Sequence, residues 1–412
     1  MDKTNPYLLP FFRKKMLVMT LLGFSSGLPL PLTSGTLQAY LAVSGIDIKL
    51  LGVFSIVGLP YTFKFLWAPF LDKLSLPILT RRRGWIFLTQ FFLFFIVISY
   101  IWVDPTYHLW IVGLLTFLLA FVSASQDIVV DAYRADSLNT EERGPGASFF
   151  VLGYRLAMLA SGALAMIMAD NLGWKFTYFV LSFLVIIGII GTLIGKEEDT
   201  VIEMKYGFKD FIIVPLADLY HRHGSYLIFV FIFLYKLGDA YLGAMTVPFL
   251  IKSVGFTPTD VGTVNKGAGI LFTIIGAFLG AFLMIRINLF RALLYFGLLQ
   301  MVSNLGFILL SIYGKNYFIF VFCVAFENIS GGMGTAAFMA FLMYLCNKKF
   351  SATQFAIISS LSSLGRIVVS PTSGFVADSV GWIPFFFISS GLAIPGLISL
   401  YKVKRFIREG EA

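Results

Sequence analysis

The chain alternates long apolar runs with short polar stretches, and this pattern predicts a protein that crosses the membrane many times. A membrane-spanning helix needs about 20 largely apolar residues. Because lipid offers the backbone no hydrogen-bond partners, such runs are expected to be helices, and the predicted fold class is an all-α polytopic membrane protein. On this measure the sequence predicts twelve transmembrane helices, at residues 16–43, 50–71, 85–103, 109–134, 147–169, 175–194, 225–251, 258–284, 292–311, 317–344, 354–377 and 382–401.

The composition supports this interpretation. Hydrophobic residues make up 58% of the chain and charged residues 13%, whereas about a quarter of the residues in soluble domains are charged. The formal net charge of +9 does not indicate nucleic-acid binding, because the basic residues are spread over many short loops. The two cysteines, Cys323 and Cys346, form neither a disulfide framework nor a zinc-ligand pattern. We therefore expect no metal, no cofactor and no nucleic-acid partner.

Lysine and arginine are distributed unevenly between the two sets of loops. The loops on the side of the N-terminus are rich in both, for example at residues 81–83 and 348–349. The positive-inside rule therefore predicts that both termini are cytoplasmic. The opposite loops carry only four basic residues, Lys49, Lys175, Lys252 and Lys315.

The longest loop, residues 196–224, divides the chain into two predicted halves. The N-terminal half comprises residues 1–195 and the C-terminal half residues 225–412, each with six predicted spans. Within the linker, residues 208–220 mix apolar and charged side chains. This mixture predicts an interfacial helix that lies along the membrane surface.

The two halves resemble each other in sequence at a spacing of about 210 residues. Residues 44–52 (SGIDIKLLG) resemble 254–262 (VGFTPTDVG), and 169–174 (ADNLGW) resemble 377–382 (ADSVGW). Arg155 and Arg366 recur at the same spacing. Two parallel six-helix repeats joined by a cytoplasmic loop resemble the plan of the major facilitator superfamily, whose substrate site lies between the halves near the bilayer midplane.

Ionisable residues within membrane spans are costly and therefore suggest function. In the C-terminal half, three basic side chains but only two acidic ones are expected near the middle of their spans. The excess of positive charge predicts a site for an anionic substrate. Either acid is a candidate proton carrier, because a carboxyl group changes its proton affinity when its surroundings change. The residues concerned are Lys236, Asp239, Lys266, Glu327 and Arg366, with Asn328 as a further polar candidate.

The segment 123–134 (SASQDIVVDAYR) follows an apolar run and carries the N-terminal half's polar stripe. Asp127, Asp131 and Arg134 share one helical face, and Gln126 lies one residue away from it. Asp127 is a third candidate proton carrier and is predicted to pair with Arg155, either for structure or for function. A predicted cytoplasmic gate of salt bridges involves Asp72, Arg81, Asp131 and Arg134.

The first span, at residues 23–41 (GFSSGLPLPLTSGTLQAYL), contains glycines and prolines that weaken a helix. Two interpretations are open. The span is either a broken helix lining a cavity or a kinked helix whose small residues permit close packing. In the first case six polar side chains would bind a polyhydroxylated ligand, namely Ser25, Ser26, Thr33, Ser34, Gln38 and Tyr40.

Several segments are similar to the AmpG-type muropeptide permeases in the same order along the chain. They are residues 23–41 and 124–138 (ASQDIVVDAYRADSL), 142–165 (ERGPGASFFVLGYRLAMLASGALA) and 327–342 (ENISGGMGTAAFMAFL). The resemblance implies a proton-coupled importer in the bacterial inner membrane. Such an importer carries anhydromuropeptides from periplasm to cytoplasm for cell-wall recycling. The matching positions are Gln126, Asp127, Asp131, Arg134, Arg155, Glu327 and Asn328.

Other functions are compatible with the same pattern. An excess of cations also suits a permease for another bulky anionic solute, such as a siderophore or a CoA ester. A membrane-embedded transferase is disfavoured, because no pair of acids or histidines near the membrane surface offers a general base or a metal site. The expected partners are a sugar peptide, protons and the lipid bilayer, and we expect a monomer that is not an enzyme.

Overall fold

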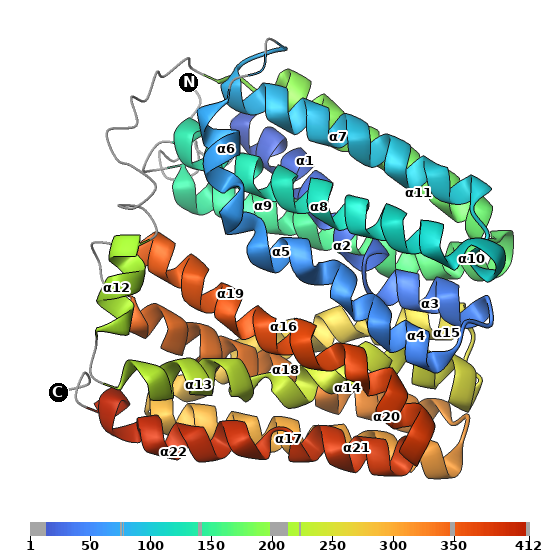
Figure 1. Ribbon diagram of the computed structural model, residues 1–412, viewed down its shortest axis with the longest axis vertical. Helices are drawn as coiled ribbons and strands as arrows, with labels where there is room; N and C mark the ends of the chain where they lie inside the picture. The colour runs from blue at the N-terminus through green and yellow to red at the C-terminus, as the bar shows by residue number, and fades with distance from the viewer. Residues whose placement is uncertain are drawn as a thin grey trace, which may run out of the picture. The chain divides into compact units, whose positions relative to one another are not determined.

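The computed structural model describes residues 14–74, 76, 78–138, 142–197, 213–221, 224–346 and 351–408 (Figure 1). Regular structure in these ranges is entirely helical, which confirms the predicted all-α fold. Eleven segments in them are long and apolar enough to cross a membrane, and they coincide with eleven of the twelve predicted spans. The predicted span 354–377 forms α19 (Ser351–Val369), η9 (Ser370–Thr372) and α20 (Ser373–Val380). It is more polar than the others, since it carries several serines and Arg366.

The chain divides into two compact units. Among the described residues, unit 1 contains 14–45 and 57–197, and unit 2 contains 46–56 and 213–408. The first part of the second span thus packs with unit 2. Most of the predicted linker lies outside the described residues, including 208–212 of the predicted interfacial helix. Its described part contains α12 (Val214–Tyr220), and Asp218 on α12 accepts a hydrogen bond of 2.6 Å from Gln354 on α19.

Unit 1 contains five whole spans and the second part of the second span, and several of them are interrupted. The fourth span forms α8, which is kinked at His108 (φ −132°, ψ 44°) and whose first turn is capped by the Asp104 carboxylate accepting from the Thr106 amide at 2.9 Å. The elements are α1 (Lys14–Gly27), α2 (Pro29–Leu32), α3 (Gly35–Val43), α5 (Leu59–Phe63), η3 (Lys64–Leu66), α6 (Ala68–Lys73), α7 (Arg81–Ser99), η4 (Tyr100–Trp102), α8 (Pro105–Ser137), α9 (Arg143–Met158), η5 (Leu159–Leu164), α10 (Ala165–Leu172) and α11 (Trp174–Ile194).

Unit 2 begins with the short helix α4 (Ile48–Val53), and η2 (Phe54–Gly58) leads from it into unit 1. The remaining elements are α13 (Ser225–Tyr235), α14 (Leu237–Pro248), η7 (Phe249–Val254), α15 (Pro258–Asp260), η8 (Val261–Ala268), α16 (Gly269–Met284), α17 (Leu289–Tyr313), α18 (Tyr317–Leu345), α21 (Trp382–Gly391) and α22 (Ile394–Arg408), together with α12, α19, η9 and α20. Two segments of unit 2, η7 and η8, are π-helices, and the first full span of the unit is interrupted at Lys236.

Glycine contacts allow the helices of unit 1 to approach closely. A Cβ atom on Gly153 of α9 would lie 2.0 Å from the carbonyl oxygen of Thr20 on α1, and one on Gly23 would lie 2.1 Å from that of Phe150. No side chain fits at such distances. The close-packing interpretation of the glycines in the first span is therefore supported at Gly23.

Unit 2 repeats this contact at the equivalent place. A Cβ atom on Gly365 of α19 would lie 2.7 Å from the carbonyl oxygen of Phe233 on α13. The offset in sequence from Gly153 to Gly365, and that from Thr20 to Phe233, are both close to the spacing of the sequence repeat. The internal repeat is thus visible in the packing of the helices.

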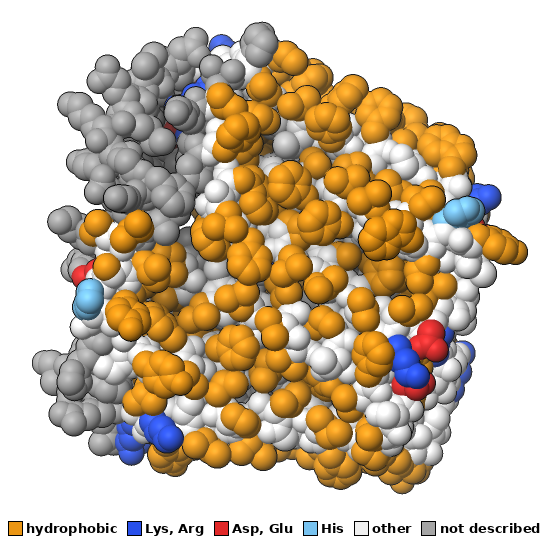
Figure 2. All heavy atoms as spheres, viewed as in Figure 1, with side chains coloured by type: hydrophobic (Ala, Val, Ile, Leu, Met, Phe, Trp, Pro, Cys, Tyr) orange, Lys and Arg blue, Asp and Glu red, His pale blue; other side chains and the backbone are white. Residues whose placement is uncertain are grey.

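Hydrophobic side chains cover most of the surface seen in Figure 2, and charged ones lie toward its margins. Large apolar side chains such as Trp110, Phe278 and Phe318 are more than 70% exposed. An apolar surface of this extent is unfavourable in water and suits contact with lipid.

Candidate functional site

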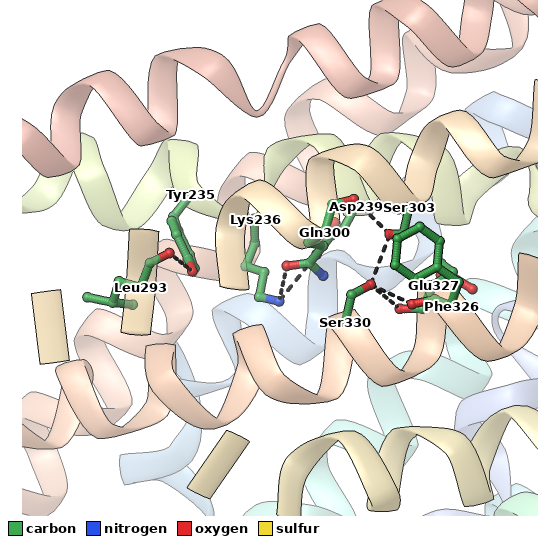
Figure 3. A network of polar contacts seen from close by, with 9 residues as sticks. All are labelled: Tyr235, Lys236, Asp239, Leu293, Gln300, Ser303, Phe326, Glu327 and Ser330. Atoms are coloured by element: carbon green, nitrogen blue, oxygen red, sulfur yellow. Dashed lines mark hydrogen bonds and ion pairs between the residues drawn. The ribbon is translucent and has the colours of Figure 1, made fainter. Parts of the chain in front are cut away.

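The seventh span is broken at Lys236. Helix α13 ends at Tyr235 and α14 begins at Leu237, and Lys236 lies between them with φ −100° and ψ 9°. Its Nζ donates to Asp239 Oδ2 at 3.2 Å and to Gln300 Oε1 on α17 at 3.0 Å (Figure 3). Interrupted spans expose backbone and side-chain groups at binding sites in transporters. Lys236 is therefore at a position suited to a site, but its charge is already neutralised by Asp239.

A glycine on α18 provides the space for this pair. A Cβ atom on Gly334 would lie 2.7 Å from Gln300 Oε1 and 3.4 Å from Lys236 Nζ. Any larger residue at 334 would displace the Gln300 amide. The glycine-rich stretch of the tenth span thus shapes a polar contact as well as helix packing.

Helix α18 presents a second polar group near the first. Asn328 Nδ2 donates to Glu327 Oε2 at 3.0 Å, and Thr273 Oγ1 on α16 donates to Asn328 Oδ1 at 2.9 Å. The nearby Ser330 and Ser303 hydroxyls join α18 to α17 at 2.9 Å. Asn328 thus orients the Glu327 carboxylate. The sequence alone did not predict this contact.

Lys266 lies in η8, a π-helical segment, and Glu327 is its electrostatic neighbour. Within the described ranges Lys266 makes no ion pair or hydrogen bond. Single π-helical turns are frequent at functional sites. Glu327 also interacts with Asp239 and Lys236, so two lysines and two acids form one connected group in unit 2.

Arg366 and Arg155 differ from these lysines. Arg366 on α19 has an exposed side chain, and it forms no ion pair with any residue that the structure describes. Arg155 on α9 is also exposed; its guanidinium donates to the sulfur of Met158 at 3.9 Å and forms no ion pair with a described residue. An arginine facing lipid costs about 2.5–3.5 kcal/mol or more. Both side chains therefore require polar surroundings, and no acid among the described residues pairs with either of them.

The ion pair expected between Asp127 and Arg155 is absent from the described part of the chain, and that prediction was wrong. The main basic neighbour of Asp127 is instead Lys64 in η3, and Tyr61 and Ser26 also lie close to the carboxyl group. The prediction relied on similar depth in the membrane. Depth does not fix the direction in which a side chain leaves its helix.

Gln126 and Ser25 are buried and bonded to each other. Gln126 Nε2 donates to Ser25 Oγ at 3.0 Å, and Gln90 Nε2 on α7 donates to the same oxygen at 3.2 Å. Gln90 Oε1 in turn accepts from Thr192 on α11 at 2.9 Å. These contacts join four helices of unit 1, so both side chains have a structural use in addition to any predicted contact with substrate.

The other polar candidates of the first span are also buried, except Ser34, which is exposed. Tyr40 donates its hydroxyl to the carbonyl oxygen of Val103 at 3.0 Å, and its ring lies 4.9 Å from that of Trp174. Gln38 is 8% exposed and has a partner, whereas Ser26 Oγ is buried without a hydrogen bond to any described residue. A role of these residues in binding stays a prediction.

The charged residues predicted to form a gate lie at one end of unit 1. Arg81 contacts Asp136 at 3.8 Å, joining α7 to α8, whereas Asp131 and Arg134 pair within α8 at 3.5 Å. Arg134 also lies over the Phe150 ring, 4.2 Å from its centre. The side chain of Asp72 lies outside the described residues.

Sequence reasoning missed three residues that the structure places beside the candidates, namely Lys64, Gln300 and Thr273. Lys64 is a single cation within the run YTFKFLW. A charged residue inside a predicted span was the signal that marked the other candidates, and it could have marked Lys64 as well. Gln300 and Thr273 are uncharged residues in apolar spans. Only the packing of α17 and α16 against α18 identifies them.

Comparisons with known proteins agree with this architecture. Residues 16–368 match the family model of the Major Facilitator Superfamily. An anhydromuropeptide permease of Escherichia coli K12 is 48% identical over 398 residues, which cover 96% of this chain and 81% of that protein. A putative transporter AmpG 4 of Rickettsia conorii is 32% identical over 390 residues, covering 92% and 94%.

A solved structure shares the fold at low sequence identity. The inward-facing, unoccupied structure of a bacterial homologue of the lysosomal transporter Spinster has a TM-score of 0.72 and 12% identity, and the match covers 99% of each chain. Together with the eleven apolar helices, these similarities indicate a membrane transporter rather than an enzyme. The chain belongs to the major facilitator superfamily and, within it, to the AmpG-type family of anhydromuropeptide permeases.

Proposed function

We propose that this protein imports anhydromuropeptides across the bacterial inner membrane, from periplasm to cytoplasm, and that the proton gradient drives the import. The relative from Escherichia coli, with 48% identity over nearly the whole chain, is named for that substrate class. The distribution of lysine and arginine over the loops supports cytoplasmic termini. The two six-helix halves and the cytoplasmic linker remain part of this proposal.

The observation that carries the proposal is the pair of arginines without acidic partners among the described residues. Arg155 and Arg366 lie on repeat-related helices, and each is exposed. A muropeptide has carboxylates that match the planar guanidinium in a bidentate manner. Anionic cargo would thus supply the counter-charge that the described part of the chain does not.

Proton coupling is assigned to acids that lie next to lysines. Asp239 shares Lys236 with Gln300, and Glu327 is oriented by Asn328 beside Lys266. Cargo that competes for these lysines would change the surroundings of both carboxylates. Such a change links proton binding to cargo binding. Asp127 beside Lys64 is the corresponding candidate in unit 1.

The test is uptake of labelled anhydromuropeptide by proteoliposomes of known sidedness, with and without an imposed pH gradient. We expect saturable uptake that the gradient accelerates. Uptake that is unaffected by muropeptide competitors and by the gradient would reject the proposal. Competition by a citrate-type siderophore or a CoA ester, but not by muropeptide, would instead support a permease for another anionic solute.

Substitution of the arginines tests the assignment of residues. Arg366→Ala and Arg155→Ala should each raise the KM about ten-fold or more, the loss of roughly 1.5–3 kcal/mol for a charge-assisted hydrogen bond. Arg291→Ala is the matched control, because Arg291 is exposed in the first turn of α17. A KM unchanged in the first two variants, at equal expression, would make these arginines structural.

A further inference from the structure

Each unit places a lysine of its second span next to an acid of its fourth span. In unit 2 these are Lys266 in η8 and Glu327 on α18, which interact electrostatically. In unit 1 they are Lys64 in η3 and Asp127 on α8. Neither lysine forms an ion pair or hydrogen bond with a described residue. The pairs are therefore loose enough to exchange partners.

The packing of η3 against α8 places Lys64 beside Asp127. Trp67 Nε1 donates to Ser125 Oγ on α8 at 2.9 Å, and the Trp67 ring lies 4.8 Å from that of Phe121. Tyr61, one turn before Lys64, lies near Asp127 as well. Both Lys64 and Asp127 are half-buried, so a ligand could reach them without unfolding the contact.

The two pairs lie at different depths along their spans. At a rise of about 1.5 Å per residue, Asp127 lies about 33 Å along α8 from its start at Pro105, whereas Glu327 lies about 15 Å along α18 from its start at Tyr317. Spans four and ten run in the same direction, because their positions in the order of spans differ by an even number. With the termini in the cytoplasm, Lys64 and Asp127 lie toward the cytoplasmic side.

Buried hydroxyl groups surround the pair of unit 1. The Ser26 hydroxyl lies against the Asp127 carboxyl, and the Tyr61 hydroxyl lies against those of Ser123 and Thr33. The hydroxyls of Ser26, Tyr61 and Ser123 lack the geometry of a full hydrogen bond. Since buried polar groups usually have well-formed partners, these loosely bonded hydroxyls are available to a polar group of a ligand beside the charge pair.

The other charges near Asp127 are paired with each other. Asp131 contacts Arg134 at 3.5 Å on the same helix. Among the residues described, Lys64 therefore remains the main basic neighbour of Asp127. An added carboxylate would be attracted by Lys64 and repelled by Asp127, so it would bind weakly and leave quickly.

Resting on the proposed function, we propose that Lys64 and Asp127 form a release site near the cytoplasmic side, where Lys64 binds a carboxylate of the cargo and Asp127 displaces it. Lys64 is the binding residue, and Asp127 is the counter-charge that replaces the cargo. Lys266 and Glu327 form the corresponding pair nearer the periplasmic side.

The test compares the two faces of the protein in proteoliposomes of fixed orientation, with labelled anhydromuropeptide and with the same compound after amidation of its carboxyl groups. Lys64→Gln should raise the half-saturating concentration at the cytoplasmic face about ten-fold and leave that at the periplasmic face within about two-fold. Asp127→Asn should lower KM and kcat together, because release slows. Lys64→Arg should restore the affinity. Lys175→Gln, at an exposed position of unit 1, is the control.

The outcomes separate the two proposals. Equal effects of Lys64→Gln at both faces, or the same effect for the amidated compound, would overturn the release site and leave the import function intact. If the Lys64→Gln variant does not reach the membrane, the unaltered protein provides a second test. In that protein, bound cargo should protect Lys64 from amine-reactive labelling, measured by mass spectrometry. Absent protection overturns the release site. Absent uptake by the unaltered protein overturns the import function and the release site together.

Discussion

The contact of Lys236 with Asp239 and Gln300 predicts a strong coupling between the two charged residues. Lys236→Met removes the donor of both hydrogen bonds, at 3.2 Å and 3.0 Å. The side chains of the ion pair are 20% and 27% exposed, so the remaining carboxylate is only partly rehydrated. We expect the variant to lose about 2–3 kcal/mol of unfolding free energy.

The double variant Lys236→Met/Asp239→Asn removes both charges at once. Because no unpaired carboxylate remains, it should lose only about 1 kcal/mol, which is about 1–2 kcal/mol less than Lys236→Met alone, and a double-mutant cycle completed with Asp239→Asn should show strongly non-additive losses. The pair Lys49 and Asp378 is a matched control, since the distance is similar at 3.0 Å but the side chains are 45% and 43% exposed. Lys49→Met should therefore cost at most about 1 kcal/mol.

The assay is chemical unfolding in detergent micelles, followed by tryptophan fluorescence, with uptake measured on the same preparations. Additive losses in the double variant would refute the interpretation of Lys236 and Asp239 as a coupled pair. Equal losses in Lys236→Met and Lys49→Met would refute the argument from burial. If Lys236 also contacts cargo, uptake stays low in the double variant although its stability is largely restored.

Three further predictions concern the scaffold. In a thermal unfolding assay, Gly153→Ala should destabilise the protein by about 1–3 kcal/mol, because its Cβ would lie 2.0 Å from a backbone oxygen. Gly243→Ala, with open space around it, should be neutral or stabilising in the same assay. Destabilisation by both substitutions would contradict this reasoning. Glu197→Gln should cost about 1 kcal/mol in chemical unfolding, since the carboxylate accepts the amides of Arg82 and Arg83 at 3.0 and 3.1 Å at the start of α7; an unchanged midpoint would show that this cap contributes nothing. Hydrogen bonds from the first turn of α8 lower the pKa of Asp104. The stability that the Asp104 carboxylate contributes above about pH 4 should therefore decline as the pH falls through the folded-state pKa. Asp104→Asn should flatten this part of the pH profile of thermal unfolding.

The fold could be predicted because apolar runs of sufficient length determine spans almost independently of one another. Eleven of the twelve predicted spans appear among the described helices as expected. The span around Arg366 is more polar, and this polarity was also the signal that marked it as functional. The contact between Gly365 and Phe233 shows that the sequence repeat corresponds to a repeat of packing.

The site could be predicted only in part, since a sequence gives depth but not the neighbours of a side chain. Lys236 and Asp239 were recognised, but their pairing with Gln300 depends on the packing of α17. Asp127 was expected beside Arg155 and lies instead beside Lys64. Asp239 and Asp127 both lie at a depth in the membrane that suits a site. The packing of short segments such as η3 determines which basic residue each carboxylate meets.

The glycine contacts of α9 with α1, and of α19 with α13, bring main chain directly against main chain. Main-chain atoms have no rotamers, so such a contact cannot yield by rearranging side chains, as a contact between leucines can. A helix pair joined in this way is stiff along its length. A displacement imposed at one end of α9, which has 16 residues, therefore reaches the other end, about 24 Å away at 1.5 Å per residue, with little loss.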